Sequence, residues 1–92
     1  PAVVLQDEDY GQELPLVFVA PVTGTLRNLQ FPATVRVDPS PENGLYKPSV
    51  VLVFQARGMD RSRFGNRIGS VTPAALAEML AALDRLTGRS RP

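Results

Sequence analysis

The chain has neither cysteine nor histidine among its 92 residues. The absence of cysteine excludes a disulfide framework and any thiolate site, and it is consistent with a reducing compartment such as the cytoplasm. Together the two absences exclude Ser-His and Cys-His catalysis and the usual zinc sites. Only Arg, Lys, carboxylate, Tyr and hydroxyl groups remain for any chemistry that this chain performs.

Long apolar runs are also missing. A membrane-spanning helix needs about 18 apolar residues or more, whereas the longest apolar stretch, Pro15 to Val22, has the length of a strand. The opening apolar run is short, lacks a basic flank and ends in acidic residues, so we expect no signal peptide. Hydrophobic residues at 43% against charged residues at 21% indicate a single small globular domain spanning residues 1–92. Its core is small, so dimerisation would add stability.

The formal net charge is only +1, but the charges are unevenly placed. An acidic segment lies near the start, and a basic cluster opposed locally by Asp60 alone lies later. A basic patch of this kind suits a phosphate backbone or an acidic partner peptide, and its alternative is a solvated surface run. Neighbouring carboxylates on a strand or loop point in different directions, so the acidic segment does not predict a metal site. The two groups are Asp7, Glu8, Asp9 and Glu13, and Arg57, Arg61, Arg63 and Arg67.

Apolar patterning predicts five strands. The first is expected to be buried on both faces and the fourth, the most apolar, to be central. The second has Pro15 and Pro21, which must lie where the ladder lacks a donor, at an end or an edge. The third alternates apolar and polar residues, as a strand with one buried face does. The segments are Pro1–Gln6, Leu16–Val22, Phe31–Val37, Ser49–Ala56 and a short one at Arg67–Val71, with turn chemistry at 38–44.

A helix is predicted to begin at Thr72-Pro73, with Thr as the N-cap and Pro at the first helical position, and to end near Gly88. An apolar stripe at helical spacing is typical of packing in a core or a dimer. Its members are Leu76, Met79, Leu80, Leu83 and Leu86. No helix separates the strands, so the sheet is expected to be mainly antiparallel. The fold class is therefore mainly β, a small curved sheet or partial barrel with one C-terminal helix.

Four segments resemble, in order and spacing, sequence blocks of the MazF/PemK family of toxin endoribonucleases. PAVVLQD (residues 1–7) is similar to the family's R-P-V-V-x-Q-N/D strand, and VAPVTGTLR (19–27) to its V-A-P-I-T-S-x-x-R segment. SVVLVFQARGMD (49–60) looks like D-S-V-V-L-x-D/E-Q-I-R-T-x-D, and IGSVTP (68–73) like I-G-x-L-S/T-P. No single block is diagnostic, whereas four in register are a specific signal.

The resemblance implies an SH3-like barrel with a C-terminal helix that works as a cytoplasmic homodimer. It implies cleavage of single-stranded RNA at short sequences, without a metal or other cofactor, in a type II toxin–antitoxin system. The expected partners are RNA and a cognate antitoxin whose acidic, partly disordered segment wraps the toxin.

Metal-free cleavage of RNA uses the substrate's own 2′-hydroxyl as the nucleophile and leaves a 2′,3′-cyclic phosphate. The enzyme must assist two proton transfers and stabilise charge on phosphate. Arginine suits the electrostatic task, although its pKa above about 12 makes it a poor base. The family's catalytic threonine corresponds to Thr23, whose hydroxyl would donate to a phosphate oxygen; the alternative role is a strand-end Thr that bonds its own backbone.

The family's catalytic arginine immediately precedes the proline that corresponds to Pro1, so it falls outside this chain, as does the family's first strand. A barrel that lost its first strand would expose an edge. We therefore expect that the sequence begins inside a longer chain; the alternative is that Pro1 is the mature start.

The resemblance implies that Thr25, Gln55 and Arg57 bind RNA; Gln55 and Arg57 correspond to the family's Q-x-R and would reach RNA or brace the site, although a strand Gln and a charged flank are also common without function. Phe54 stands where many members carry an acid and Gly58 where many carry Thr, so the recognised base sequence is expected to differ. Two other functions remain open. One is a gyrase-binding toxin of the CcdB type, although those proteins depend on a C-terminal Trp-Gly-Ile and this chain has no tryptophan. The other is a catalytically silent member that binds RNA or antitoxin.

Overall fold

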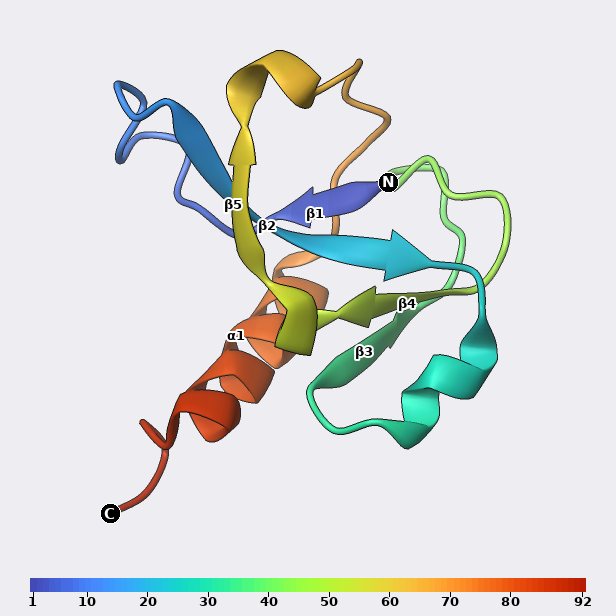
Figure 1. Ribbon diagram of the computed structural model, residues 1–92. Helices are drawn as coiled ribbons and strands as arrows, with labels where there is room; N and C mark the ends of the chain where they lie inside the picture. Colours follow the sequence, from blue (N-terminus) through green and yellow to red (C-terminus); the bar gives the residue numbers. More distant parts are fainter.

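The computed structural model describes all residues from Pro1 to Pro92, and it consists of a bent antiparallel sheet with one α-helix packed against it (Figure 1). The helix is shorter and more polar than a membrane-crossing helix must be. The elements are β1 (Ala2–Val4), β2 (Leu16–Thr23), η1 (Leu26–Gln30), β3 (Thr34–Val37), β4 (Ser49–Leu52), η2 (Val53–Gln55), β5 (Arg57–Asp60), η3 (Arg61–Arg63) and α1 (Pro73–Thr87).

Strand β2 is shared among three partners. Its first half, Leu16–Val19, pairs with β5, its middle pairs with β1, and its last two residues pair with β4. Pro21 lies between the part that pairs with β5 and the part that pairs with β4. Because Pro has no N–H to donate, it is tolerated at this transfer from one partner to the next. Pro15 directly precedes β2, as the predicted position at a strand end requires, whereas Pro21 lies inside β2, so the prediction of an end or an edge is wrong for Pro21.

The predicted strand Ser49–Ala56 is two strands in the structure. All four residues of β4 are buried, and β4 is central, between β2 and β3, as expected. The chain then turns through the 3₁₀ segment η2 and continues as β5. This corner lets β4 pair with the end of β2 while β5 pairs with its beginning. An uninterrupted strand could not pair with both halves of a strand that bends.

The sheet is antiparallel throughout and carries a C-terminal helix, which confirms the predicted fold class. The strand order is β1-β2-β4-β3, with β5 added to the other part of β2. No pairing joins the outer strands, so the curved sheet is not closed into a barrel.

Strand β1 is less buried than predicted. It pairs with β2 alone, and 49% of Val4 is exposed. The expectation of a strand buried on both faces is wrong, because an apolar run of this length does not distinguish a central strand from an edge strand. Val3 and Leu5 do pack against the core.

Two other predicted strands differ from the structure. The alternating segment Phe31–Val37 forms a strand only from Thr34 onward, where Val35 and Val37 are buried and Arg36 is exposed. Ala33 has φ of 56°, a left-handed conformation that cannot continue a strand. Arg67–Val71 forms no strand, since only an isolated hydrogen bond from the Ser70 N–H to the Glu42 carbonyl ties it to another segment.

Helix α1 begins and ends as predicted. The Thr72 hydroxyl oxygen accepts a hydrogen bond from the Ala75 N–H at 3.1 Å, and Pro73 occupies the first turn. Gly88 ends the helix at φ of 80°, a left-handed conformation that glycine adopts without a Cβ penalty. The helix packs on β3 and η2.

The core lies between α1 and the concave side of the sheet. Met79 and Ala82 face it, with Leu83 half-buried beside them. Of the predicted stripe, Leu80 and Leu86 remain 41% and 52% exposed, so only part of the stripe is core. The buried cluster consists of Ala20, Val35, Val37, Val51, Val53, Met79 and Ala82.

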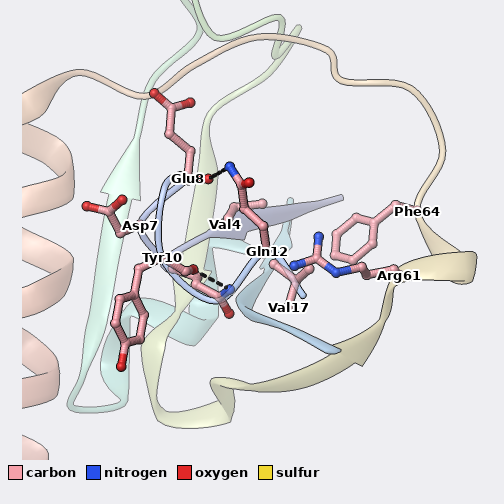
Figure 2. A pocket seen from close by; sticks show the side chains of 9 residues that line it. Val4, Asp7, Glu8, Tyr10, Gln12, Val17, Arg61 and Phe64 are labelled. Atoms are coloured by element: carbon pink, nitrogen blue, oxygen red, sulfur yellow. Dashed lines mark hydrogen bonds between the residues drawn. The ribbon is translucent and has the colours of Figure 1, made fainter. Parts of the chain in front are cut away.

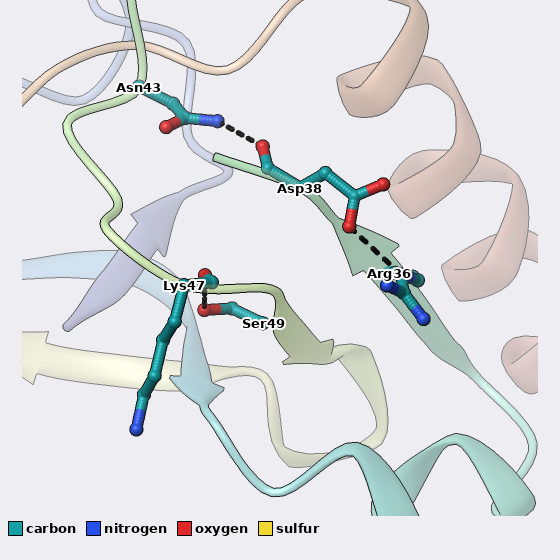
Figure 3. A network of polar contacts seen from close by, with 5 residues as sticks. All are labelled: Arg36, Asp38, Asn43, Lys47 and Ser49. Carbon is teal, nitrogen blue, oxygen red and sulfur yellow. Dashed lines mark hydrogen bonds and ion pairs between the residues drawn. The ribbon is translucent and has the colours of Figure 1, made fainter. Parts of the chain in front are cut away.

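A polar network orders the connection between β3 and β4, which spans residues 38–48 (Figure 3). The side chain of Asn43 is buried; its amide nitrogen donates to the Asp38 carbonyl at 2.8 Å, and its oxygen accepts from the backbone N–H groups of Ser40 and Leu45. The predicted turn chemistry is thus confirmed, although Asn43-Gly44 does not make a tight hairpin. The buried side chain of Asn43 thus supplies hydrogen-bond partners for backbone groups that have no strand partner in this long connection.

We expect Met79→Ala to lower the free energy of unfolding by about 2–5 kcal/mol, because Met79 is fully buried and its removal leaves a cavity under the sheet. Chemical denaturation monitored by circular dichroism measures the change. The neighbouring exposed residue gives a control, Glu78→Ala, for which we expect a change within about 0.5 kcal/mol. Equal effects of the two substitutions would contradict this description of the core.

Asn43→Ala is expected to destabilise the fold by about 2–3 kcal/mol, since three backbone groups lose their partner in a buried site. Asn66→Ala, in an exposed segment, is the matched control. Thermal unfolding of both variants compares them, and an unchanged midpoint for Asn43→Ala would show that water replaces the amide without cost.

Candidate functional site

Thr23 ends β2 and is half-buried. Its hydroxyl oxygen accepts a hydrogen bond from the Thr25 N–H at 3.2 Å, which is the local backbone role that a strand-end threonine often has. A hydroxyl can accept and donate at the same time, so the O–H of Thr23 remains able to donate. The contact also sets the direction of the chain as it leaves β2 toward η1.

The start of the chain lies beside Thr23. The Val22 N–H donates to the Pro1 carbonyl at 2.9 Å, and Ala2 is the partner of Pro21 in the β1–β2 ladder. If this antiparallel register continues for one more residue, the residue before Pro1 lies opposite Thr23. Side chains of directly opposed residues lie on the same face of a sheet, with Cβ atoms about 5 Å apart. A residue at that position would therefore have its side chain next to the Thr23 hydroxyl.

Gln55 lies in a different part of the surface. It lines a hollow of about 390 Å³ together with residues of η1 and α1. The rings of Phe31 and Phe54 meet edge to face in this hollow, with centroids 5.8 Å apart, and both are partly exposed. An exposed aromatic pair beside an amide can stack on a base and hydrogen-bond to its edge. Phe31 was not singled out by the sequence, because its alternating pattern suggested a strand.

Arg57 begins β5 and pairs with Val19 of β2. Val19 and Thr23 are four residues apart on one strand, so Arg57 and Thr23 are about 13 Å apart along β2. The guanidinium of Arg57 has neither a hydrogen bond nor an ion pair within the protein. The structure thus joins Thr23 and Thr25 directly, and it leaves Gln55 and Arg57 at separate positions on the molecule.

Two arginines of the predicted basic cluster form hydrogen bonds to different segments of the chain. Arg61 donates to the carbonyls of Leu14 and Gly11, at 2.6 and 3.1 Å, and so anchors the loop between β1 and β2. Arg67 bonds to Gly69 and Ser70 in its own segment. Backbone and side-chain hydrogen bonds from Ser62 lower the pKa of Asp60 below its ordinary value, so this carboxylate stays ionised beside the arginines.

A second hollow, of about 350 Å³, lies between the β1–β2 loop and η3 (Figure 2). Arg61 and Phe64 form one side of it, and the acidic loop with Gln12 forms the other. It contains none of the residues predicted to bind RNA. The acidic side chains do not converge, and nowhere do three potential His, Cys, Asp or Glu ligands gather. Its polar side chains mainly form hydrogen bonds within the loop between β1 and β2. The Gln12 side-chain amide, for example, donates to the Glu8 carbonyl at 2.6 Å.

No motif or spacing indicated Lys47, whose side chain lies against the backbone of Gly24, directly after Thr23. A Cβ added to Gly24 would be 2.6 Å from the Lys47 ammonium nitrogen. The two residues are far apart in the sequence, and only the pairing of β2 with β4 brings them together.

Known proteins resemble this chain in sequence and in structure. An Endoribonuclease MazF of Staphylococcus saprophyticus is 29% identical over 84 residues, which cover 91% of this chain and 69% of that protein. Another, of Staphylococcus epidermidis, is 27% identical over the same shares. The Mycobacterium tuberculosis toxin MazF-mt6 superposes with a TM-score of 0.80 at 28% identity, covering 96% of this chain and 85% of that one.

A mycobacterial endoribonuclease solved in complex with its cognate antitoxin shares the fold, with a TM-score of 0.80 at 23% identity and coverage of 100% of this chain and 84% of that one. The family model described as PemK-like, MazF-like toxin of type II toxin-antitoxin system matches residues 1–87. With nearly the whole chain matched, and with the bent sheet and C-terminal helix of solved MazF structures, the protein belongs to the PemK-like, MazF-like toxin family.

Proposed function

We propose that this protein is a sequence-specific endoribonuclease toxin that cleaves single-stranded RNA without a metal or other cofactor. Its relatives in Staphylococcus are named as endoribonucleases, and the family is one of toxins in type II toxin–antitoxin systems. The observation that carries the proposal is the Thr23 hydroxyl, free to donate and directly opposite the position before Pro1. The family motif has arginine at that position.

In the proposed reaction, the 2′-oxygen of the substrate attacks the adjacent phosphorus while the bond to the 5′-oxygen breaks. The 2′-hydroxyl loses its proton, the departing 5′-oxygen gains one, and the products are a 2′,3′-cyclic phosphate and a 5′-hydroxyl. Thr23 donates a hydrogen bond to a non-bridging phosphate oxygen. An arginine attached to Pro1 would neutralise the charge that develops on the same phosphate, for which its planar fork is suited.

Recognition of the RNA is assigned to Thr25, Gln55 and Arg57. Thr25 is tied to Thr23, so it can contact the nucleotide next to the cleaved bond. Gln55 has two exposed aromatic rings beside it, which supports a base contact in that hollow. The unpaired guanidinium of Arg57 is suited to a phosphate of the same strand.

The proposed partners are a second copy of the chain and an antitoxin, in the cytoplasm. A homodimer is supported by the small core, since only 14 of 92 residues are buried, and by the exposed Leu80 and Leu86. An acidic antitoxin segment is supported by exposed, unpaired arginines such as Arg57 and Arg63. The single domain at residues 1–92 would be completed by an upstream strand in a longer chain.

We expect Thr23→Ala in the natural full-length protein to reduce cleavage of single-stranded RNA by about 10²-fold or more, because a preorganised donor to the reacting phosphate is lost. Thr23→Ser, which keeps the hydroxyl, should retain most of the activity. Cleavage is measured in EDTA, and the new 3′ ends are tested for cyclic phosphate. Thr87→Ala, whose hydroxyl bonds only a helix carbonyl, is the control.

Each outcome of that assay has a distinct meaning. Intact RNA with the unaltered protein contradicts the nuclease, and gyrase inhibition would then identify a toxin of the CcdB type. Intact RNA with tight binding of the antitoxin would identify a silent family member. Cleavage that stops in EDTA would contradict metal independence alone.

Arg57→Gln is expected to weaken binding of single-stranded RNA at every sequence and to lower the slope of log K against log salt by about 0.7–1, the amount for one phosphate contact. Arg63→Gln removes an exposed, unpaired arginine from η3 and is the matched control. Fluorescence anisotropy over a range of salt concentrations measures both. A change in base preference without a change in slope would assign Arg57 to a base instead of a phosphate.

A further inference from the structure

Lys47 is the single lysine of the chain, and its side chain lies across the backbone at Gly24. A Cβ built on Gly24 would be 2.3 Å from Cε and 2.6 Å from Nζ of Lys47. Since a Cα–Cβ bond is about 1.5 Å long, the ammonium is within about 4 Å of the Gly24 Cα. No larger residue at position 24 would let the lysine occupy this place. The ammonium therefore lies at the backbone of the Thr23–Thr25 segment.

The main chain of Lys47 is fixed from two sides. The buried hydroxyl of Ser49 donates to the Lys47 carbonyl at 3.0 Å, and Ser49 begins β4, which is paired with the end of β2. The Asn43 network orders the preceding part of the same connection (Figure 3). The main chain of Lys47 is thus held near the end of β2 by ordered structure, whereas its side chain is exposed.

The ammonium of Lys47 has no carboxylate partner. The two ion pairs of the protein are Arg36 with Asp38 and Arg89 with Asp84. Figure 3 shows the lysine side chain running away from the Arg36–Asp38 pair and beside the end of β2. The adjoining segment, residues 23–30, contains no Asp or Glu. A positive charge without a counter-ion, at the Gly24 backbone between Thr23 and Thr25, is suited to an anionic ligand.

We propose that Lys47 binds a backbone phosphate of the RNA beside Thr23, as a point charge that positions the strand for cleavage. This inference rests on the proposed nuclease function and adds a residue to its binding machinery. Lysine presents a compact ammonium with three donors and can serve a phosphate without a fixed angular demand. The role of Gly24 is then to leave room for that ammonium.

The test measures binding of a single-stranded RNA with 2′-O-methyl sugars, which lacks the attacking hydroxyl and cannot be cleaved. In the natural full-length protein, Lys47→Ala should weaken binding about tenfold at low salt, the equivalent of one charge-assisted hydrogen bond. The slope of log K against log salt should fall by about 0.7–1. For unmodified RNA, we expect KM to rise with kcat nearly unchanged.

Gly24→Ala supplies an independent variant that leaves the charge in place. The added methyl group displaces the end of the lysine side chain, so binding should weaken almost as much as in Lys47→Ala. The double variant should be no weaker than Lys47→Ala alone, because both changes remove the same contact. Arg91→Gln, which removes an exposed cation from the end of the chain, should leave binding unchanged.

Amine-selective modification gives a readout that does not depend on substitutions. RNA should protect the Lys47 side chain from acylation, as measured by mass spectrometry of the peptide that contains Lys47. RNA binding and cleavage that are unaffected by Lys47→Ala and Gly24→Ala would overturn this inference and leave the nuclease intact. Failure of the unaltered protein to bind or cleave RNA would overturn the proposed function itself.

Discussion

The structure depends on one strand that serves three others. Strand β2 pairs with β5, β1 and β4 in turn, and Pro21 lies where the partner changes. A strand can exchange partners in this way only if it bends, because β4 leads into η2 in one direction and β5 leaves it in another. The bend gives the sheet a concave side, which α1 covers through Met79 and Ala82. It also puts the end of β2, with Thr23, at the start of the chain and beside Lys47.

The sequence predicted those elements whose signals are local. The N-cap Thr72 and the end at Gly88 were correct because capping depends on residues a few positions apart. The corner at η2 could not be predicted from the apolar run Ser49–Ala56, since its cause is the change of partner along β2. The exposure of Val4 likewise depends on the number of neighbours that β1 has, which an apolar run does not specify.

The residues of the candidate site also differ in whether a local sequence motif or only the folded structure reveals them. Thr23 was predicted from its motif, and the structure adds that its hydroxyl bonds to Thr25 and lies opposite the position before Pro1. Thr25, Gln55 and Arg57 were predicted together but occupy different places, Gln55 beside two aromatic rings and Arg57 at the start of β5. Lys47 was missed because its contact is with Gly24, which follows β2 and is distant in the sequence. Contacts of this kind become visible only when the register is known.

The register of β2 also constrains how such a chain can change during evolution. Ala20 and Val22 pack in the core cluster, Val17 and Val19 are buried at the alternate positions of the strand, and this alternation determines where the side chain of Thr23 points. An insertion or deletion of one residue between Val19 and Thr23 would turn either the apolar residues outward or the threonine to the opposite face. Substitutions can accumulate in the loops on either side, whereas the spacing within this strand cannot vary without changing either the packing or the direction of the Thr23 side chain.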